Sequence, residues 1–122
     1  MDFFNTPISS KTFELVNQVL ESGRLSTGPM VQRFESELST SLGIDNPVAV
    51  NSGTAALHLA LVLAGIESGD EIILPAQTFI ATGLVVLMQG AIPVFVDIQA
   101  STGNIDPESV QRKITSKTKA II

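Results

Sequence analysis

The chain has 122 residues, of which 44% are hydrophobic, so it is long and apolar enough to form one domain with a core, which excludes a disordered tail. Its formal net charge of −5 and its seven Lys and Arg residues argue against nucleic acid as a partner, which would require a basic surface. The absence of cysteine excludes disulfides and thiolate metal sites, and the single His58 cannot form a metal cluster.

The amino-terminal segment is predicted to be an amphipathic surface helix. Within Ser10–Ser22, the apolar residues Phe13, Val16 and Leu20 recur at helical spacing, and Gly23 follows as a cap. The first twenty residues lack the basic start and apolar core of a secretory signal, and the longest apolar runs are too short to cross a bilayer. We therefore expect a cytoplasmic protein without a membrane partner.

A second helix is predicted to start at Pro29 and to end before Gly43. Its apolar residues form one stripe, which is either part of the core or a dimer surface: Val31, Phe34, Leu38 and Leu42. The two helices together make up a helical arm that covers residues 1–45.

The remainder, residues 46–122, alternates short β-branched runs with helix-length segments. The predicted strands are Pro47–Val50, Glu71–Pro75, Ile92–Asp97 and Lys119–Ile122. The predicted helices are Thr54–Ala64, Phe79–Gln89 and Pro107–Ile114, the last with Asp106 as its N-cap. Strands that are apolar throughout are covered on both faces, which favours a parallel sheet. The pattern predicts a single α/β domain with the order βαβαβαβ, a three-layer, mainly parallel sheet with flanking helices.

The stretch "NSGTAA" lies where the first predicted strand passes into a helix. Ligands of open α/β sheets bind beyond the carboxyl ends of the strands. Gly53 allows close backbone approach, the Ser52 and Thr54 hydroxyls add donors, and the free N–H groups of a helix start attract anions such as phosphate. Alone, the turn is more typical of an ordinary helix start than of a phosphate site.

Two further strand ends contribute to the same edge. The second strand leads into "AQTFIAT", which contains Phe79, and the third ends at Asp97. Together these residues suit a flat, phosphorylated ligand. Each residue also has a purely structural interpretation. Phe79 can be a ring of the core, because the helix "FIATGLVVLM" is apolar on every side and is expected to be fully buried. Asp97 can be a carboxylate of a loop or a helix cap. His58, between two leucines, is expected to be a packed or edge residue and not a ligand.

The order of five segments resembles the amino-terminal part of the DegT/DnrJ/EryC1/StrS family of sugar aminotransferases: "STGPMVQRFE", "VNSGTAALHLAL", "GDEIILPAQTFIAT", "GAIPVFVDI" and "SVQRKITSKTKAII". The resemblance implies the aspartate aminotransferase fold, of which this chain would be part of the large domain, and the cofactor pyridoxal phosphate (PLP). It also implies transfer of an amino group, usually from glutamate, to a keto group of a nucleotide-linked sugar, and a homodimer.

By position, Ser52, Gly53, Thr54 and Ala55 resemble the family's segment that holds the cofactor phosphate. Phe79 resembles the aromatic residue that stacks on the pyridine ring. These are cofactor-binding roles, and the resemblance assigns no catalytic residue and no metal ligand to this chain.

The family supplies its Schiff-base lysine and the acidic partner of the pyridinium nitrogen after the fourth strand. None of the four lysines matches that lysine: Lys11, Lys113, Lys117 and Lys119. We therefore expect a part of an aminotransferase, cut by truncation, proteolysis or gene shortening, that is inactive alone. A non-catalytic module for phosphate ligands or assembly is the alternative. A Rossmann domain is disfavoured, because the second strand ends in Leu74–Pro75 without an acidic residue.

The family resemblance also predicts how the chain assembles. In that fold the first strand lies at the far edge of the sheet, separated from the other three by strands that have no counterpart in these 122 residues. Unpaired edges are avoided in soluble proteins. We therefore expect either that Pro47–Val50 joins the other strands directly or that the chain self-associates.

Overall fold

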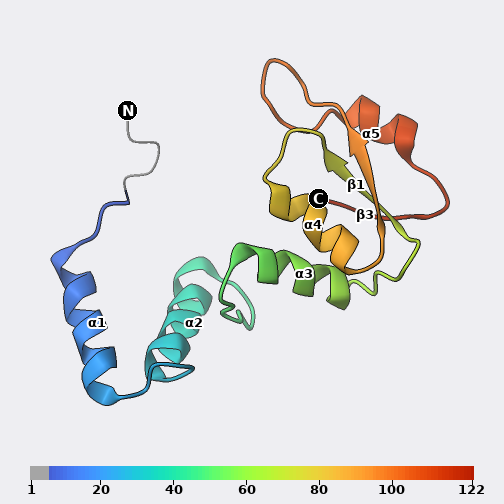
Figure 1. Cartoon of the computed structure of the whole chain (residues 1–122). Coiled ribbons are helices and arrows are strands. Elements are labelled where there is room, and N and C mark those ends of the chain that lie inside the picture. Colours follow the sequence, from blue (N-terminus) through green and yellow to red (C-terminus); the bar gives the residue numbers. More distant parts are fainter. Residues whose placement is uncertain (1–5) are drawn as a thin grey trace. The chain divides into compact units, whose positions relative to one another are not determined.

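The computed structural model describes residues 6–122 (Figure 1). The first five residues of the predicted helical arm lie outside this range. The chain divides into two compact units, one that ends at Ala49 and one that runs from Val50 to Ile122. Among the described residues, no helix has both the length and the apolar character needed to cross a membrane.

The first unit contains the two predicted helices. Helix α1 spans Ser10–Ser22 and helix α2 spans Pro29–Leu42, and each ends at a glycine in the left-handed conformation. Gly23, with a φ of 67°, donates its N–H to the carbonyl of Leu20 and so closes the end of α1. Both helix predictions are confirmed. The sequence is sufficient for these predictions because a glycine cap is a local signal at the end of a helix.

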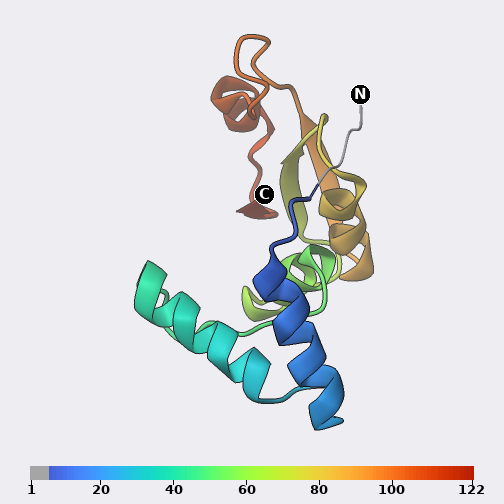
Figure 2. The same cartoon turned by 90° about the vertical axis from the view of Figure 1, so that its left-hand side faces the viewer.

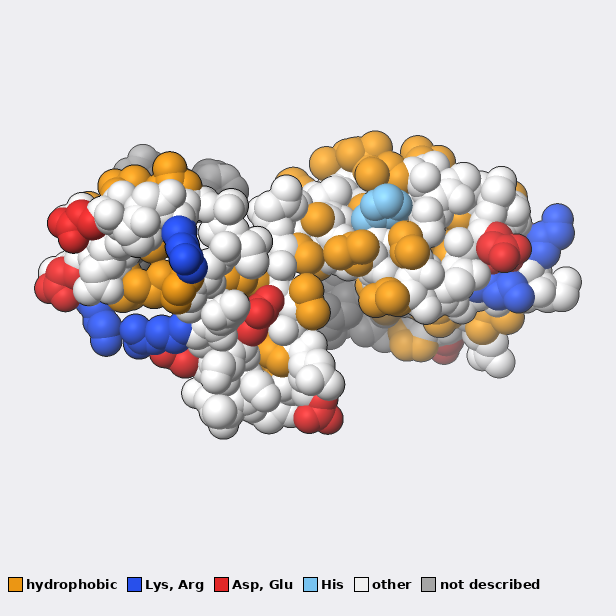
Figure 3. Space-filling view, turned by 90° about the horizontal axis from the view of Figure 1, so that it is seen from below, with side chains coloured by type: hydrophobic (Ala, Val, Ile, Leu, Met, Phe, Trp, Pro, Cys, Tyr) orange, Lys and Arg blue, Asp and Glu red, His pale blue; other side chains and the backbone are white. Residues whose placement is uncertain are grey.

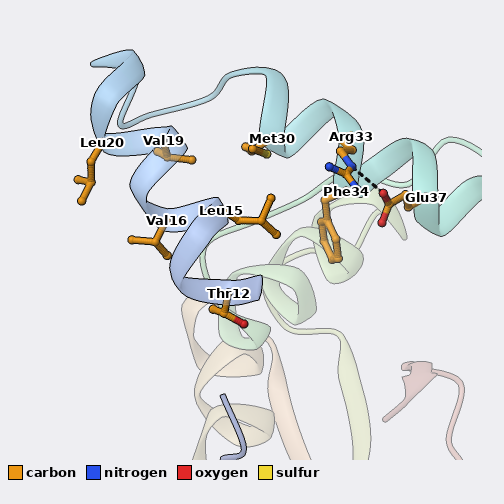
Figure 4. Close-up of a pocket in the computed structure, with 9 residues that line it drawn as sticks. All are labelled: Thr12, Leu15, Val16, Val19, Leu20, Met30, Arg33, Phe34 and Glu37. Atoms are coloured by element: carbon orange, nitrogen blue, oxygen red, sulfur yellow. Dashed lines mark hydrogen bonds and ion pairs between the residues drawn. The ribbon is translucent and has the colours of Figure 1, made fainter. Parts of the chain in front are cut away.

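An apolar groove of about 390 Å³ separates α1 from α2 (Figure 4). Leu15 of α1 and Phe34 of α2 both border the groove, and an ion pair between Arg33 Nε and Glu37 Oε1, 2.7 Å long, lies at its rim. Neither helix has a buried residue, and Phe34 remains 53% exposed. The apolar stripe of α2 therefore does not form a closed core in this unit.

The second unit is built on a parallel sheet of three strands in the order β2-β1-β3. The strands are β1 (Glu71–Pro75), β2 (Ile92–Val96) and β3 (Thr118–Ile121). Ile73 of the central strand pairs with Val94 on one side and with Ile121 on the other. The predicted parallel pairing of these strands is confirmed, with strand ends within one residue of the prediction.

Helices cover both faces of this sheet. The helices are α3 (Gly53–Leu63), α4 (Ile80–Met88) and α5 (Pro107–Lys113). On one face, Ile72 packs with Leu61 of α3 and with residues of α4, whereas on the other face Ile73 packs with Val110 of α5. Figure 2 shows α4 and α5 on opposite sides of the strands. The predicted three-layer α/β arrangement is confirmed.

The predicted strand at Pro47–Val50 is wrong, because these residues form no strand. A strand exists only where a neighbour completes its hydrogen bonds, and β1 already pairs with β2 and β3 on its two sides. Pro47 has no N–H, and the N–H of Ala49 binds Glu35 Oε1 of α2 at 2.8 Å. Direct joining of this segment to the sheet, one of the two assembly outcomes expected, is therefore not observed.

The prediction that the apolar α4 is buried on every side is also wrong. Its buried residues are Ala81, Thr82, Val85 and Val86, whereas Ile80, Leu84, Leu87 and Met88 are exposed. The helix belongs to an outer layer, and a helix in such a layer buries only the stripe that faces the sheet. Hydrophobic side chains also lie exposed on the surface shown in Figure 3, and those of α3 include Leu59, Val62 and Leu63.

Candidate functional site

The carboxyl edge of the sheet carries the starts of two helices. Helix α4 begins after the carboxyl end of β1, and α3 ends before the first residue of β1. Both helices run opposite to the strand and pack against each other, so their amino ends lie on the same side of the unit (Figure 1). The structure therefore brings the two predicted parts of the site, Ser52–Ala55 and Phe79, to one edge.

Ser52 is the N-cap of α3 and organises the turn. Its Oγ accepts the N–H of Ala55 at 3.1 Å and donates to Asn51 Oδ1 at 3.2 Å. Within residues 6–122, the N–H groups of Gly53 and Thr54 and the Thr54 hydroxyl make no hydrogen bond. The turn thus presents two backbone donors and one hydroxyl that are free to bind an acceptor.

Gly53 leaves open space where a side chain would lie, next to these donors in the chain. Its φ lies outside the left-handed region, so the backbone does not require a glycine there. A Cβ added at Gly53 meets no atom within 4 Å, so neighbouring residues do not require a glycine either. What the missing side chain provides is room beside the free N–H groups, which fits a phosphate group.

Phe79 is the N-cap residue of α4 and is 76% exposed. The alternative interpretation of Phe79 as a core ring is therefore wrong. As the N-cap residue it is not part of the buried stripe of α4. An exposed aromatic face at the carboxyl edge is available to stack on a flat ligand.

Sequence reasoning missed a hydroxyl pair on either side of Phe79. The Oγ1 atoms of Thr78 and Thr82 lie 3.0 Å apart, and Thr82 is only 8% exposed. The i, i+4 spacing of the two threonines in "TFIAT" was the available signal.

Asp97 is exposed directly after the carboxyl end of β2, and His58 lies within α3. The N–H of Asp97 donates to Ser109 Oγ at 3.2 Å, and its carbonyl accepts the N–H of Asp106 at 2.9 Å, so its backbone supports the loop before α5. The Nε2 atom of His58 is buried without a hydrogen-bond partner among the described residues. Within residues 6–122, no group of three or more His, Cys, Asp and Glu residues is placed to hold a metal ion.

The model of the DegT/DnrJ/EryC1/StrS aminotransferase family matches residues 7–122. The chain belongs to this family. The resemblance found in the five sequence segments is confirmed, and so is the fold that it implied.

Similar proteins share both sequence and structure with this member of the DegT/DnrJ/EryC1/StrS family. SpsC of Bacillus subtilis, a spore coat polysaccharide biosynthesis protein, is 46% identical over 115 residues, which are 94% of this chain and 30% of SpsC. The structure of Spr1654 from Streptococcus pneumoniae, which is assigned as a sugar aminotransferase, is 39% identical with a TM-score of 0.88, covering 97% of this chain and 31% of Spr1654.

A further structure, a GDP-4-keto-6-deoxy-D-mannose-3-dehydratase from E. coli, is 30% identical with a TM-score of 0.87, covering 96% of this chain and 32% of the dehydratase. The family member described here spans about a third of the length of these relatives. Spr1654 was solved with PLP and with its amino form, and the dehydratase with hydrated PLP. PLP is thus the cofactor common to these two structures.

Proposed function

We propose that this chain is the cofactor-phosphate-binding part of a PLP-dependent aminotransferase that acts on a nucleotide-linked keto sugar and takes the amino group from an amino acid such as glutamate. The observation that carries the proposal is the turn at Gly53, where two N–H groups without a partner among the described residues begin α3 and the position of a Gly53 side chain is open space. Family membership supports PLP as the ligand of that turn.

The phosphate group of PLP fits the turn by charge and by hydrogen bonding. The N–H groups of Gly53 and Thr54 donate to phosphate oxygens, and the positive end of the helix dipole of α3 favours the dianion. The Thr54 hydroxyl adds a third donor. Ala55 acts differently from these residues, because its N–H is bound to Ser52 Oγ and so orients the Ser52 hydroxyl.

Phe79 contributes the second contact, with the pyridine ring. An aromatic side chain that is 76% exposed gains contact area and excludes water when a flat ring stacks on it. When bound, PLP withdraws electrons from the carbon that carries the amino group. The residues proposed here bind and orient the cofactor, and none is assigned a proton-transfer step.

The type of reaction is inferred from sequence similarity. A solved relative is a dehydratase with bound PLP, so a PLP site on this fold serves more than one reaction. The higher identity to Spr1654, 39% against 30% for the dehydratase, supports the aminotransferase. The alternative role, a non-catalytic module for phosphate ligands or assembly, needs the same turn but not Phe79.

We also propose that the chain self-associates. The outer edges of β2 and β3 carry no partner strand within the described sheet, and Phe95 of β2 and Ile121 of β3 are more than half exposed. Unpaired apolar edges favour pairing with another strand, and a second copy supplies one.

Equilibrium dialysis of the 122-residue chain against PLP, pyridoxal and inorganic phosphate tests the cofactor proposal. We expect PLP to bind reversibly and more tightly than either of the other two, because it alone engages both the turn and the ring. Equal affinity for PLP and inorganic phosphate would favour the non-catalytic phosphate module. Absence of binding by all three would refute the proposed site.

A further inference from the structure

The start of α4 has an unusual cap. N-cap positions favour Ser, Thr, Asp or Asn, whose side chains accept a free N–H of the first turn. Here Phe79 occupies the N-cap, and no side chain caps the helix. Only its carbonyl is engaged, accepting the N–H of Thr82 at 3.0 Å. The local sequence thus places an exposed aromatic ring where a polar cap would stabilise the helix.

A hydrogen bond between two hydroxyl groups spans this uncapped start. Thr78 Oγ1 and Thr82 Oγ1 are 3.0 Å apart, so the residue before Phe79 is joined to the residue three positions after it. Thr82 lies on the buried face of α4 with Val85 and Val86. The bond therefore ties the exposed Thr78 to a residue anchored in the core.

This arrangement restricts the backbone on both sides of Phe79. The Thr82 N–H holds the Phe79 carbonyl, and the hydroxyl pair holds the preceding residue. Without the pair, the residues before α4 would be free to rotate, and the ring would be free to fold onto the exposed apolar surface of Ile80. A ring that stacks on a cofactor must instead keep one orientation, which reduces the entropy lost on binding.

We propose that Thr78 and Thr82 form a positioning pair that fixes the orientation of the Phe79 ring toward PLP. This inference rests on the proposed function, since it concerns the ring of the same site. The two threonines do not touch the cofactor in this proposal. They act through Phe79, so their loss changes how the pyridine ring is held more than how the phosphate is bound.

The chain contains neither Trp nor Tyr, so Phe79→Trp introduces a single indole at the ring position. In this background, Thr78→Val removes the hydroxyl at nearly constant shape, and Thr78→Ser keeps it. Thr27→Val, at an exposed threonine between α1 and α2, is the matched control. Two signals are measured: the anisotropy of the indole without ligand, and its quenching at saturating PLP.

We expect Thr78→Val to lower the anisotropy and to reduce the quenching at saturation roughly twofold, because a freed ring samples several rotamers. Thr78→Ser restores both signals, and Thr27→Val changes neither. Thr82→Val has the effect of Thr78→Val, and the double variant adds nothing further, because both changes remove one bond. The affinity for inorganic phosphate stays unchanged throughout.

Unchanged anisotropy and quenching in Thr78→Val would overturn the positioning role. This holds even if the variant is less stable, because a purely structural bond affects only the free energy of unfolding. If the Phe79→Trp parent and the unmodified chain both fail to bind PLP, the proposed function fails. The anisotropy without ligand then still decides whether the pair orients the ring.

Discussion

Ser52 Oγ accepts the N–H of Ala55 at 3.1 Å and thereby closes the first turn of α3. This bond satisfies only one of the N–H groups that a helix start leaves free. The N–H groups of Gly53 and Thr54 have no partner within the described chain. The cap that stabilises the helix therefore also holds the proposed phosphate donors in a fixed arrangement.

Replacing Gly53 with alanine separates ligand binding from folding. Its Cβ enters open space within the chain, so we expect the free energy of unfolding to stay within about 1 kcal/mol of wild type, on the stabilising side. The same Cβ occupies the space proposed for phosphate, so the affinity for PLP should fall about tenfold or more, a loss of roughly 1.4 kcal/mol. Equilibrium dialysis and urea unfolding measure the two effects.

Gly83→Ala in α4 is the control for this variant. Gly83 is also helical, and an added Cβ there would make an ordinary contact of 3.7 Å with Leu74. It should leave the affinity for PLP unchanged. If Gly53→Ala binds PLP as well as wild type while remaining folded, the turn is an ordinary helix cap.

Borohydride reduction distinguishes reversible binding from a covalent site. All four lysines are exposed, and we predict that none of them forms a Schiff base with PLP: Lys11, Lys113, Lys117 and Lys119. We expect the 122-residue chain with PLP to show no transamination of glutamate and no stoichiometric pyridoxyl adduct after reduction. Peptide mass mapping identifies any adduct. One lysine modified stoichiometrically would show that the chain carries a Schiff-base residue that the sequence comparison missed.

Elements with local caps were predictable from the sequence. Asp106 accepts the N–H groups of Glu108 and Ser109, both at 3.2 Å, as its place before Pro107 indicated. Gly43 likewise ends α2 in the left-handed conformation. These signals lie within a few residues of the feature that they determine, so one sequence is sufficient to find them.

Features that depend on distant partners were not predictable. Pro47–Val50 has the composition of a strand, but composition does not reveal whether a neighbouring strand exists, and here the N–H of Ala49 binds Glu35 instead. The exposure of Phe79 also depends on where α4 begins and on which of its faces packs on the sheet. The apolar sequence around it contains no polar face that would mark the orientation.

Core packing predicts a large effect at the central strand. Ile72 is fully buried in the cluster that joins β1 to α3 and α4. Ile72→Ala should lower the free energy of unfolding by about 2–5 kcal/mol, because it removes buried methyl groups and leaves a cavity. Leu63→Ala is the control, since Leu63 is 86% exposed and its truncation should change stability little. If urea unfolding shows that Ile72→Ala and Leu63→Ala lower the free energy of unfolding equally, α3 packs in solution on a surface that covers Leu63.

Self-association should depend on the outer strand β3. Its Ile121 is 53% exposed, and the far side of the strand pairs with no other strand of the described sheet. We expect sedimentation equilibrium at low micromolar concentration to show association of the wild-type chain. Ile121→Lys should weaken that association, because charged residues at a sheet edge oppose pairing between chains.

Lys119→Met removes a charge from β3, whereas Ile121→Lys adds one. Lys119 is exposed on β3, and a lysine at an edge opposes pairing, so its removal should strengthen association. If association is weaker in Ile121→Lys and stronger in Lys119→Met, the contact between copies lies at β3. If association changes in the same direction in both variants, the cause is a general effect on solubility. A compact wild-type monomer that unfolds cooperatively would contradict self-association. It would mean that three strands with open edges, covered by α3, α4 and α5, are stable without a second copy.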